Sequence, residues 1–409
     1  MGSMREDAKT IIQRTITDVL PDRAVREALK DMRLSGRVYV VAVGKAAWVM
    51  ARAAAGHLAH RLEKGVILTK YGHSRGELEG FEIIEAGHPT PDDNSVRGAR
   101  AAIRLAGEAS PGDTVLLLLS GGGSSLMELP ADGLSLEDIR EVTRQLLHCG
   151  AGITEINVLR KRLSAVKGGK FARHLGHARA FSVILSDIVG GGGEMVASGL
   201  TYPDGSTAEE ARRIVETYGL RLSGRVERAL YSDPPSLEAG VENHVVGSVG
   251  ELCRAAAAHA GELGYTPHIL TSTLQCEARE AGRWIASLAG PGYRKPYALI
   301  AGGETVVKVT GEGMGGRNQE LALAAAEVLS GREDVLLFSL GSDGTDGPTD
   351  AAGGMVDGRT ARLLRQKGID IGEVLRNNDS YHALAAVDGL IMTGATGTNV
   401  NDVTVLLCR

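Results

Sequence analysis

Short apolar runs rich in β-branched residues alternate with longer segments of helical periodicity along almost the whole chain. In the first half, strands are predicted at residues 38–43, 66–68, 81–84, 115–119 and 180–185. Ala-rich helical segments such as 46–58 fill the gaps between most of them. Buried strands alternating with helices are typical of a parallel sheet covered on both faces, so we predict a doubly wound, Rossmann-like α/β fold here.

The second half shows the same alternation of strands and helices, after helical segments within 202–239 and a strand at 241–246. The chain has 409 residues, whereas single cores stop growing near ~250–300 residues, so we predict two α/β domains, 4–238 and 239–409. A hairpin-like pair around Gly302 and Gly303 predicts that the second sheet is mixed. Its strands are predicted at 266–270, 297–301, 305–309, 335–340 and 403–407.

The amino-acid composition indicates which kinds of molecule the protein can bind. A formal charge of -5, from 45 basic and 50 acidic residues, provides no positive field for nucleic acid, and no basic amphipathic stretch suggests a membrane surface. No run approaches the ~18 apolar residues of a membrane span, and the four cysteines lack CxxC spacing. We expect a cytoplasmic protein that binds small molecules, and the sequence leaves a monomer and a homodimer both open.

Glycine is the compositional outlier, because 55 residues are glycine and many cluster in runs. In open α/β sheets the ligand crevice lies beyond the carboxyl ends of the strands, where these runs fall. The first run follows strand 38–43, where Gly44 and Lys45 lead into a helix. A helix N-terminus favours anions, and the ammonium of Lys45 adds a full charge, which predicts a phosphate or carboxylate site. The alternative is a surface lysine in a first helical turn.

The second run follows strand 115–119. Successive glycines allow the backbone to approach a ligand and to turn its N–H groups toward it, and serine hydroxyls add donors. An anion-binding nest is therefore predicted, with a flexible connector as the alternative. The candidate binding residues are Gly44 of the first run and Ser120, Gly121, Gly122, Gly123, Ser124 and Ser125 of the second.

A basic stretch and a strand-end carboxylate follow. Five of the eleven residues from 160 to 170 are basic and could steer a nucleotide, although a solvated helix face is the alternative. We take Asn157, Arg160 and Lys167 as candidate binding residues. Asp187 ends a strand beside Gly190–Gly193 and is a candidate base or metal ligand, or a residue that merely caps a turn.

The second half carries three more glycine-rich segments, which contain the candidate binding residues Glu304 and Asn318. Arg317 opens a helical segment at 318–329, where a guanidinium grips carboxylate or phosphate oxygens bidentately. Asp343 and Asp346 lie in a glycine-rich loop after a strand and are candidate Mg²⁺ ligands, because Mg²⁺ takes few carboxylates and keeps much of its water. A plain Asp/Gly turn is the alternative.

A G-x-G-x-x-G pattern at Gly311, Gly313 and Gly316 raises a rival interpretation, an NAD-dependent hydroxypyruvate reductase. The acidic residue of that fingerprint should close the next strand about 20 residues on, and here it comes later, at Asp343. A sensor that binds a sugar acid or nucleotide without catalysis is a third interpretation, from a different class.

The strings Gly44-Lys45-Ala, Ser120-Gly-Gly-Gly-Ser124, Gly315-Gly-Arg317-Asn-Gln-Glu320 and Ser342-Asp-Gly-Thr-Asp-Gly-Pro-Thr-Asp350 together resemble the glycerate 2-kinases, whose C-terminal part is the MOFRL domain. The resemblance covers nearly the whole chain. It implies phosphorylation of D-glycerate at the 2-hydroxyl by ATP with Mg²⁺, in an interdomain cleft. The family's proposed catalytic lysine and arginine fall on Lys45 and Arg317.

On this basis we expect the ATP phosphates on the glycine loops and Lys45, and Arg317 on the glycerate carboxylate or the transferring phosphoryl group. Asp187 is the candidate acceptor of the 2-hydroxyl proton. The sequence departs from the family after Asp187, where Gly190–Gly193 replaces a Pro-Gly-Asp-Asp type of turn, so a metal role for that loop is in doubt.

Overall fold

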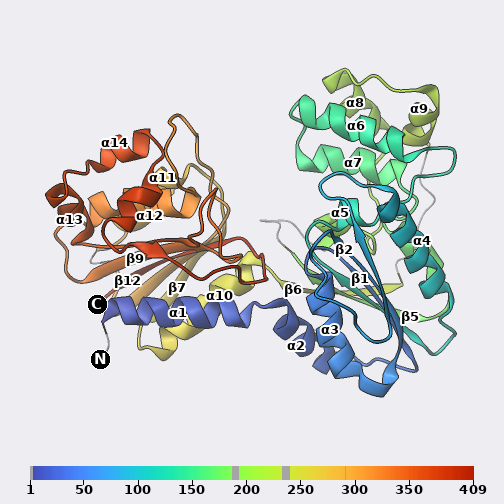
Figure 1. Cartoon of the computed structure of the whole chain (residues 1–409), viewed down its shortest axis with the longest axis horizontal. Helices are drawn as coiled ribbons and strands as arrows, with labels where there is room; N and C mark the ends of the chain where they lie inside the picture. Colours follow the sequence, from blue (N-terminus) through green and yellow to red (C-terminus); the bar gives the residue numbers. More distant parts are fainter. Residues whose placement is uncertain (1–2, 187–192, 233–239, 291) are drawn as a thin grey trace. The chain divides into compact units, whose positions relative to one another are not determined.

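The computed structural model describes residues 3–186, 193–232, 240–290 and 292–409 (Figure 1). Contacts along the chain divide these residues into two compact units. One unit holds the described residues from Ala24 to Val246, and the other holds residues 3–23 and Gly247–Arg409. The first helix of the chain thus packs with the C-terminal unit, and the predicted division at 238/239 stays a prediction, since 233–239 lie outside the described residues.

The first unit is built on a six-stranded sheet with the strand order β3-β2-β1-β4-β5-β6. The pairs β2–β3, β1–β2, β1–β4 and β4–β5 are all parallel. This is the order of a Rossmann-type sheet and confirms the predicted doubly wound fold. The strands are β1 (Val38–Val43), β2 (Leu62–Lys70), β3 (Phe81–Ala86), β4 (Thr114–Leu119), β5 (Arg179–Leu185) and β6 (Val241–Gly247).

The direction in which strands are added reverses at β1. The chain adds β2 and β3 on one side of β1 and then crosses back to add β4 on the other. Because parallel crossovers are right-handed, the helices α3 (Ala47–Leu58) and α4 (Asp93–Gly107) fall on opposite faces of the sheet, as Figure 1 shows. β1 and β4 run in register up to the pair Val43 and Leu119, so the two glycine-rich loops leave the sheet side by side.

A helical layer completes this unit, with its own small core of Leu, Ile and Val side chains that include Leu146, Leu159 and Leu230. It consists of α6 (Leu136–His148), α7 (Ile153–Leu163), α8 (Ala208–Tyr218) and α9 (Gly224–Tyr231). The remaining elements are α2 (Pro21–Asp31), α5 (Gly123–Leu126), and the 3₁₀ turns η1 (Ala59–Arg61), η2 (Lys170–His174) and η3 (Gly193–Ser198).

The second unit contains a six-stranded sheet with the order β11-β10-β9-β12-β8-β7. The sheet is mixed, as predicted: β7 runs parallel to β8, while β12 is antiparallel to both β8 and β9. The strands are β7 (Thr266–Leu274), β8 (Tyr297–Gly303), β9 (Val335–Gly341), β10 (Gly353–Asp357), β11 (Leu390–Ile391) and β12 (Asp402–Cys408).

The predicted hairpin between 297–301 and 305–309 is wrong. β8 has β7 on one side and β12 on the other, so no edge is left for a strand at 305–309. That segment makes a single bridge, from Val306 to Glu277. The mixed character arises instead from β10 and β12, which are antiparallel to β9.

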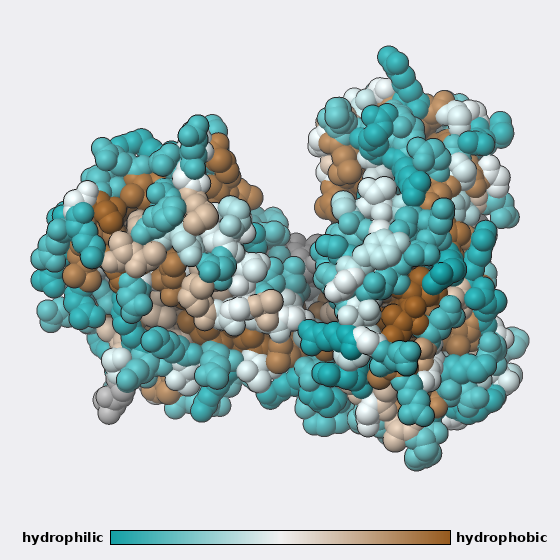
Figure 2. All heavy atoms as spheres, viewed as in Figure 1, coloured by the Kyte–Doolittle hydropathy of each residue, from teal (hydrophilic) through white to brown (hydrophobic). Residues whose placement is uncertain are grey.

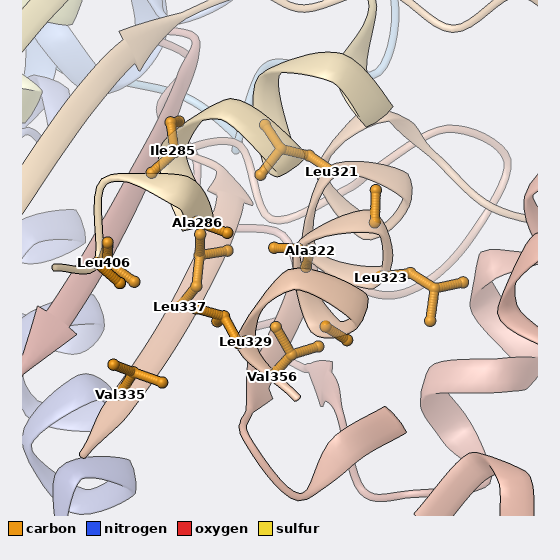
Figure 3. Packing of buried hydrophobic residues seen from close by; sticks show 14 of the residues in the cluster. Ile285, Ala286, Leu321, Ala322, Leu323, Leu329, Val335, Leu337, Val356 and Leu406 are labelled. Atoms are coloured by element: carbon orange, nitrogen blue, oxygen red, sulfur yellow. The ribbon is translucent and has the colours of Figure 1, made fainter. Parts of the chain in front are cut away.

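The main core of the second unit lies under α11 (Ala278–Ser287) and α12 (Arg317–Leu329). Figure 3 shows Leu321, Ala322 and Leu329 of α12 packed toward Leu337 and Val356 of the sheet. Gly282 allows the close crossing of the two helices, because a Cβ there would lie 2.0 Å from the carbonyl oxygen of Leu321.

The opposite face of the second sheet is covered by α1 (Met4–Asp18) and α10 (Val249–Glu262) (Figure 1). Buried Asp7 ties α1 down, because it pairs with Arg409 and accepts a hydrogen bond of 2.7 Å from the Tyr265 hydroxyl. The remaining helices are α13 (Thr360–Gln366), α14 (Ile371–Arg376) and α15 (Ser380–Ala385).

The visible surfaces of the units are mostly hydrophilic, with hydrophobic residues in separate patches (Figure 2). Within the described part of the chain, none of the helices combines the length and the apolar character needed to cross a bilayer.

Candidate functional site

The first cluster of predicted site residues forms where β1 and β4 end. Gly44 and Ser120 follow the paired strand ends, and the N–H of Ser120 donates to the carbonyl oxygen of Val43 at 2.9 Å. The N–H of Lys45 donates to the carbonyl oxygen of Gly121 at 2.9 Å, and the N–H of Ala46 donates to Ser120 Oγ at 3.1 Å. The two loops are therefore one hydrogen-bonded structure at the point where the strand order reverses, which is where such sheets bind ligands.

Glycine is required in the first loop. Gly44 has a φ of 130°, and a Cβ at this position would lie 2.1 Å from Ser120 Oγ. Buried Thr69 fixes the loop from the other side, because its hydroxyl donates to the carbonyl oxygen of Gly44 at 3.0 Å. The close approach of the two loops depends on this missing side chain.

The side chain of Lys45 is exposed beside the second loop, in the turn that leads into α3. Gly122 has a φ of 86°, and a Cβ there would lie 3.3 Å from Lys45 Cγ and 3.2 Å from His88 Nε2. Partial burial, with Lys45 and Lys70 nearby, lowers the pKa of His88 to about 4, so His88 is neutral at pH 7. None of the described carboxylates pairs with Lys45, which leaves its charge available to an anion.

A chain of hydroxyl and amide groups leads away from the second loop. Ser124 Oγ lies 2.8 Å from Ser198 Oγ, which in turn donates to Asn157 Oδ1 at 2.9 Å. Ala197 and Ser198 both have positive φ values, 51° and 53°, which is uncommon for residues with side chains. Ser198 and Asn157 are buried, so they position Ser124, which is half-buried, rather than face solvent themselves.

In the predicted basic stretch, residues 160–170, four of the five basic side chains have a hydrogen-bond or ion-pair partner. Lys161 lies 4.0 Å from Asp204, and Lys170 Nζ donates to the carbonyl oxygens of Lys161 and Ser164, each at 2.7 Å. Arg162 is buried and donates to the carbonyl oxygens of Leu230, Ser232 and Ser206 at 2.7–2.9 Å. These three side chains hold the helical layer together.

Lys167 is fully buried and forms an ion pair with the carboxylate of buried Glu128. Ser164 Oγ donates to the other oxygen of Glu128 at 2.6 Å. Burial lowers the pKa of Lys167, and Glu128 opposes that shift. Lys167 therefore has no exposed surface with which to contact a ligand. Arg160 differs from the other four, because no hydrogen bond or ion pair joins it to any described residue.

The second cluster lies in the second unit, around Arg317, the first residue of α12. Its guanidinium donates to both carboxylate oxygens of Asp402 on β12, from Nε at 2.5 Å and from Nη2 at 2.9 Å. Glu304 lies 3.9 Å from Arg317 Nη1 and also accepts from Asn401 Nδ2 at 3.2 Å. Burial raises the pKa of Asp402 to about 6 against the opposing effect of Arg317, whose own pKa is raised by the two carboxylates.

Asp346 and Asn318 have structural partners. Both carboxylate oxygens of Asp346 accept backbone N–H groups at the start of α12, from Asn318 at 3.1 Å and from Gln319 at 2.9 Å. Asn318 is buried, and its Oδ1 accepts from Ser339 Oγ at 2.6 Å. Asp346 is thus an N-terminal cap that orients the helix carrying Arg317.

The G-x-G-x-x-G segment packs against its own chain. A Cβ at Gly311 or Gly313 would lie within 2.5 Å of the backbone of Asn377, and one at Gly316 would lie 2.3 Å from Asp346 Cγ. The N–H of Gly313 donates to the carbonyl oxygen of Asn377 at 2.8 Å. These glycines are explained by contacts within the protein, which removes the reason to assign them to a dinucleotide.

Comparisons with known proteins agree with this arrangement. The domain of unknown function DUF4147 matches residues 7–231, and the MOFRL family matches residues 297–402. A D-glycerate 2-kinase of Thermotoga maritima is 51% identical over 98% of this chain and 97% of its own length. The chain belongs to the glycerate 2-kinase family.

Two further relatives of the family are informative. The crystal structure of a glycerate kinase from Thermotoga maritima superposes with a TM-score of 0.95 at 50% identity and covers 99% of both chains. A protein of Agrobacterium vitis named as a putative hydroxypyruvate reductase is 39% identical over 91% of this chain and 99% of its own length.

For this glycerate 2-kinase family member, the structure brings the predicted residues together in two sets. Gly44, Lys45 and Ser120–Ser125 lie in two hydrogen-bonded loops of the first unit, and Arg317 and Glu304 lie together in the second unit. Asp187 lies outside the described residues, so its predicted role as base stays a prediction.

The sequence analysis assigned no site role to four residues that organise these sets, namely His88, Glu128, Ser198 and Asp402. His88 comes from the loop after β3, and Glu128 and Asp402 each meet a cation that is distant in sequence. Asp402 had one local signal, since it ends the loop that follows Thr396 and begins a strand. The other three carried none.

Proposed function

We propose that this protein transfers the γ-phosphoryl group of ATP to the 2-hydroxyl of D-glycerate and releases 2-phosphoglycerate and ADP. The observation that carries the proposal is the exposed Lys45, which none of the described carboxylates pairs with, beside a glycine loop where the strand order reverses. The chain is 51% identical to a D-glycerate 2-kinase. Phosphoryl transfer depends mainly on positioning and on neutralising charge, which such a loop provides.

Each set has its own part in this proposal. In the first unit, backbone N–H groups of the glycine loop and the ammonium of Lys45 hold phosphate oxygens, and neutral His88 adds a ring nitrogen without charge. In the second unit, Asp402 holds the guanidinium of Arg317 in one orientation, and the third nitrogen, Nη1, 3.9 Å from Glu304, is the one that would bind a carboxylate or phosphoryl oxygen. Asp187 is the proposed acceptor of the hydroxyl proton, and the predicted interdomain position of the active site stays a prediction.

Mg²⁺ fits the loop that follows β9. A Cβ at Gly341 would lie 3.3 Å from Asp343 Oδ1 and 3.4 Å from Asp402 Oδ1, so two carboxylates converge where there is no side chain. The buried Oδ1 of neighbouring Asn401 has no hydrogen-bond partner among the residues that the structure describes. Mg²⁺ typically takes one or two carboxylates together with water and phosphate oxygens, and it neutralises phosphate charge when bound. We propose Asp343 as its protein ligand, and not Asp346 or Asp402, because the oxygens of Asp346 cap α12 and those of Asp402 accept from Arg317.

A hydroxypyruvate reductase is the second candidate, because two relatives are named as putative hydroxypyruvate reductases. The packing of Gly311, Gly313 and Gly316 against the chain itself argues against a dinucleotide at that segment. Incubation with hydroxypyruvate and NADH distinguishes the two directly, because a reductase consumes the absorbance of NADH at about 340 nm and a kinase leaves it unchanged.

The kinase proposal is tested by mixing the protein with D-glycerate, ATP and Mg²⁺ and measuring ADP. Phosphorus NMR of the product then reports the position of the phosphate. Release of ADP with 2-phosphoglycerate supports the proposal, and 3-phosphoglycerate contradicts the regiochemistry. ATP binding without ADP release contradicts the kinase and supports a non-catalytic sensor. A cytoplasmic location and a homodimer stay predictions.

A further inference from the structure

Arg160 is the one member of the basic stretch that no described group neutralises. It lies on α7, one turn beyond Asn157, and is half-buried. Burial lowers its pKa, and only the nearby charge of Glu128 opposes that effect. A partly desolvated guanidinium with no hydrogen-bond acceptor among the described residues is less well stabilised than a surface arginine, so its place in the fold calls for an explanation.

Glu128 does not provide a partner. One of its oxygens receives Lys167 Nζ, and the other accepts from Ser164 Oγ at 2.6 Å and from the N–H of Leu129 at 3.0 Å. Among the described residues, the group formed by Arg160, Lys167 and Glu128 therefore carries one uncompensated positive charge. Lys167 is enclosed, so Arg160 is the member that can meet an external anion.

The helix that carries Arg160 is also connected to the glycine loop. Asn157, on the same helix, accepts from Ser198, and Ser198 contacts Ser124 at the start of α5. Gly122, the residue before α5, adjoins Lys45. A chain of polar residues, in which Ser198 and Asn157 are buried, thus leads from the loop beside Lys45 to the helix that carries Arg160.

We propose that Arg160 binds the carboxylate of the acceptor substrate and thereby selects hydroxy acids over neutral polyols. This inference rests on the proposed function, and it deepens it by assigning the substrate carboxylate to the first unit. A single surplus charge matches a monoanionic carboxylate, whereas the more highly charged triphosphate needs several positive groups. The planar guanidinium also fits a carboxylate bidentately, which an ammonium does not.

The test compares Arg160→Met with Arg160→Lys and with Arg97→Met, which removes an exposed arginine from α4 as a matched control. We expect Arg160→Met to raise KM for D-glycerate by about 10- to 100-fold, the usual size of a lost charge-assisted hydrogen bond, with KM for ATP changed less than about twofold. Arg160→Lys, which keeps the charge, should show an intermediate effect, and Arg97→Met should show none.

Two further readouts separate recognition from folding and from the kinase reaction. Isothermal titration of D-glycerate without nucleotide should show binding by the wild type that Arg160→Met weakens, and this holds even if the protein is not a kinase. Glyceramide, the neutral amide analogue, should lose less affinity than D-glycerate in Arg160→Met. A circular dichroism spectrum of Arg160→Lys that matches the wild-type spectrum verifies that folded proteins are being compared.

The contrary outcomes are distinct. A rise in KM for ATP alone would assign Arg160 to a nucleotide phosphate and overturn the carboxylate assignment. Equal losses for D-glycerate and glyceramide, or unchanged D-glycerate binding in Arg160→Met, would overturn it as well. Absence of ADP release by the wild type, with D-glycerate binding that still depends on Arg160, would contradict the kinase and leave the carboxylate site standing.

Discussion

The buried pair of Lys167 and Glu128 provides the sharpest test of how the first unit is held together. The side chain of Lys167 is 0% exposed and that of Glu128 is 2% exposed, so neither charge is solvated. We consider Lys167→Met, which removes the cation, Glu128→Gln, which removes the anion with its shape retained, and the double variant. Removing one partner of a buried pair leaves the other charge uncompensated.

The structure predicts unequal losses for the two single variants. Breaking a buried ion pair typically costs ~3–5 kcal/mol. Lys167→Met should fall near the lower end, about 3 kcal/mol, because Arg160 and two hydrogen bonds from Ser164 and Leu129 remain to stabilise Glu128. Glu128→Gln should fall near the upper end, about 5 kcal/mol, because it leaves Lys167 and Arg160 as neighbouring cations.

The double variant should cost less than Glu128→Gln alone, because a neutral pair of similar volume leaves no unpaired charge at Lys167. The assay is urea unfolding followed by tryptophan fluorescence. The chain has two tryptophans, Trp48 in the first unit and Trp284 in the second, so a Trp284→Phe background makes buried Trp48 report on the unit that contains the pair. Losses that simply add in the double variant would refute the reasoning.

Three further results are expected. Arg317→Ala should lower kcat by about 10²- to 10³-fold, the usual effect of removing one aligned donor, and unchanged turnover would remove Arg317 from the mechanism. Gly44→Ala should destabilise the first unit by about 1–3 kcal/mol in the same urea assay, because the added Cβ meets Ser120. Gly56→Ala should not destabilise it, because the space around Gly56 is open. Equal losses of stability in the two variants would contradict the steric explanation. His88 should titrate by NMR with a midpoint near pH 4. Because the ordinary pKa of histidine is about 6.5, the contribution of His88 to the stability of the folded protein should be lost as the pH falls from about 6.5 to 4. A titration midpoint near pH 6.5 would be inconsistent with the burial of His88.

The sequence by itself determined the features that depend on local order. The apolar run at 38–43 followed by Gly44 and Lys45 predicted a strand, a turn and a helix, and the structure has β1, that turn and α3 there. The run before Ser120 did the same for β4, and Arg317 opens α12 as expected. Periodicity and glycine placement act within a few residues, so they can be read from neighbouring positions alone.

Tertiary structure decided the rest. The hairpin at 305–309 failed because β12, nearly a hundred residues later in the chain, occupies the edge of β8. The sequence chose Arg160 and Lys167 alike as binding residues, whereas the fold gave Lys167 a carboxylate 39 positions away and left Arg160 without an ion pair to any described residue. Arg317 is oriented by Asp402, 85 positions away. A charge acts on whatever lies within a few ångströms, and only the folded chain determines which groups those are.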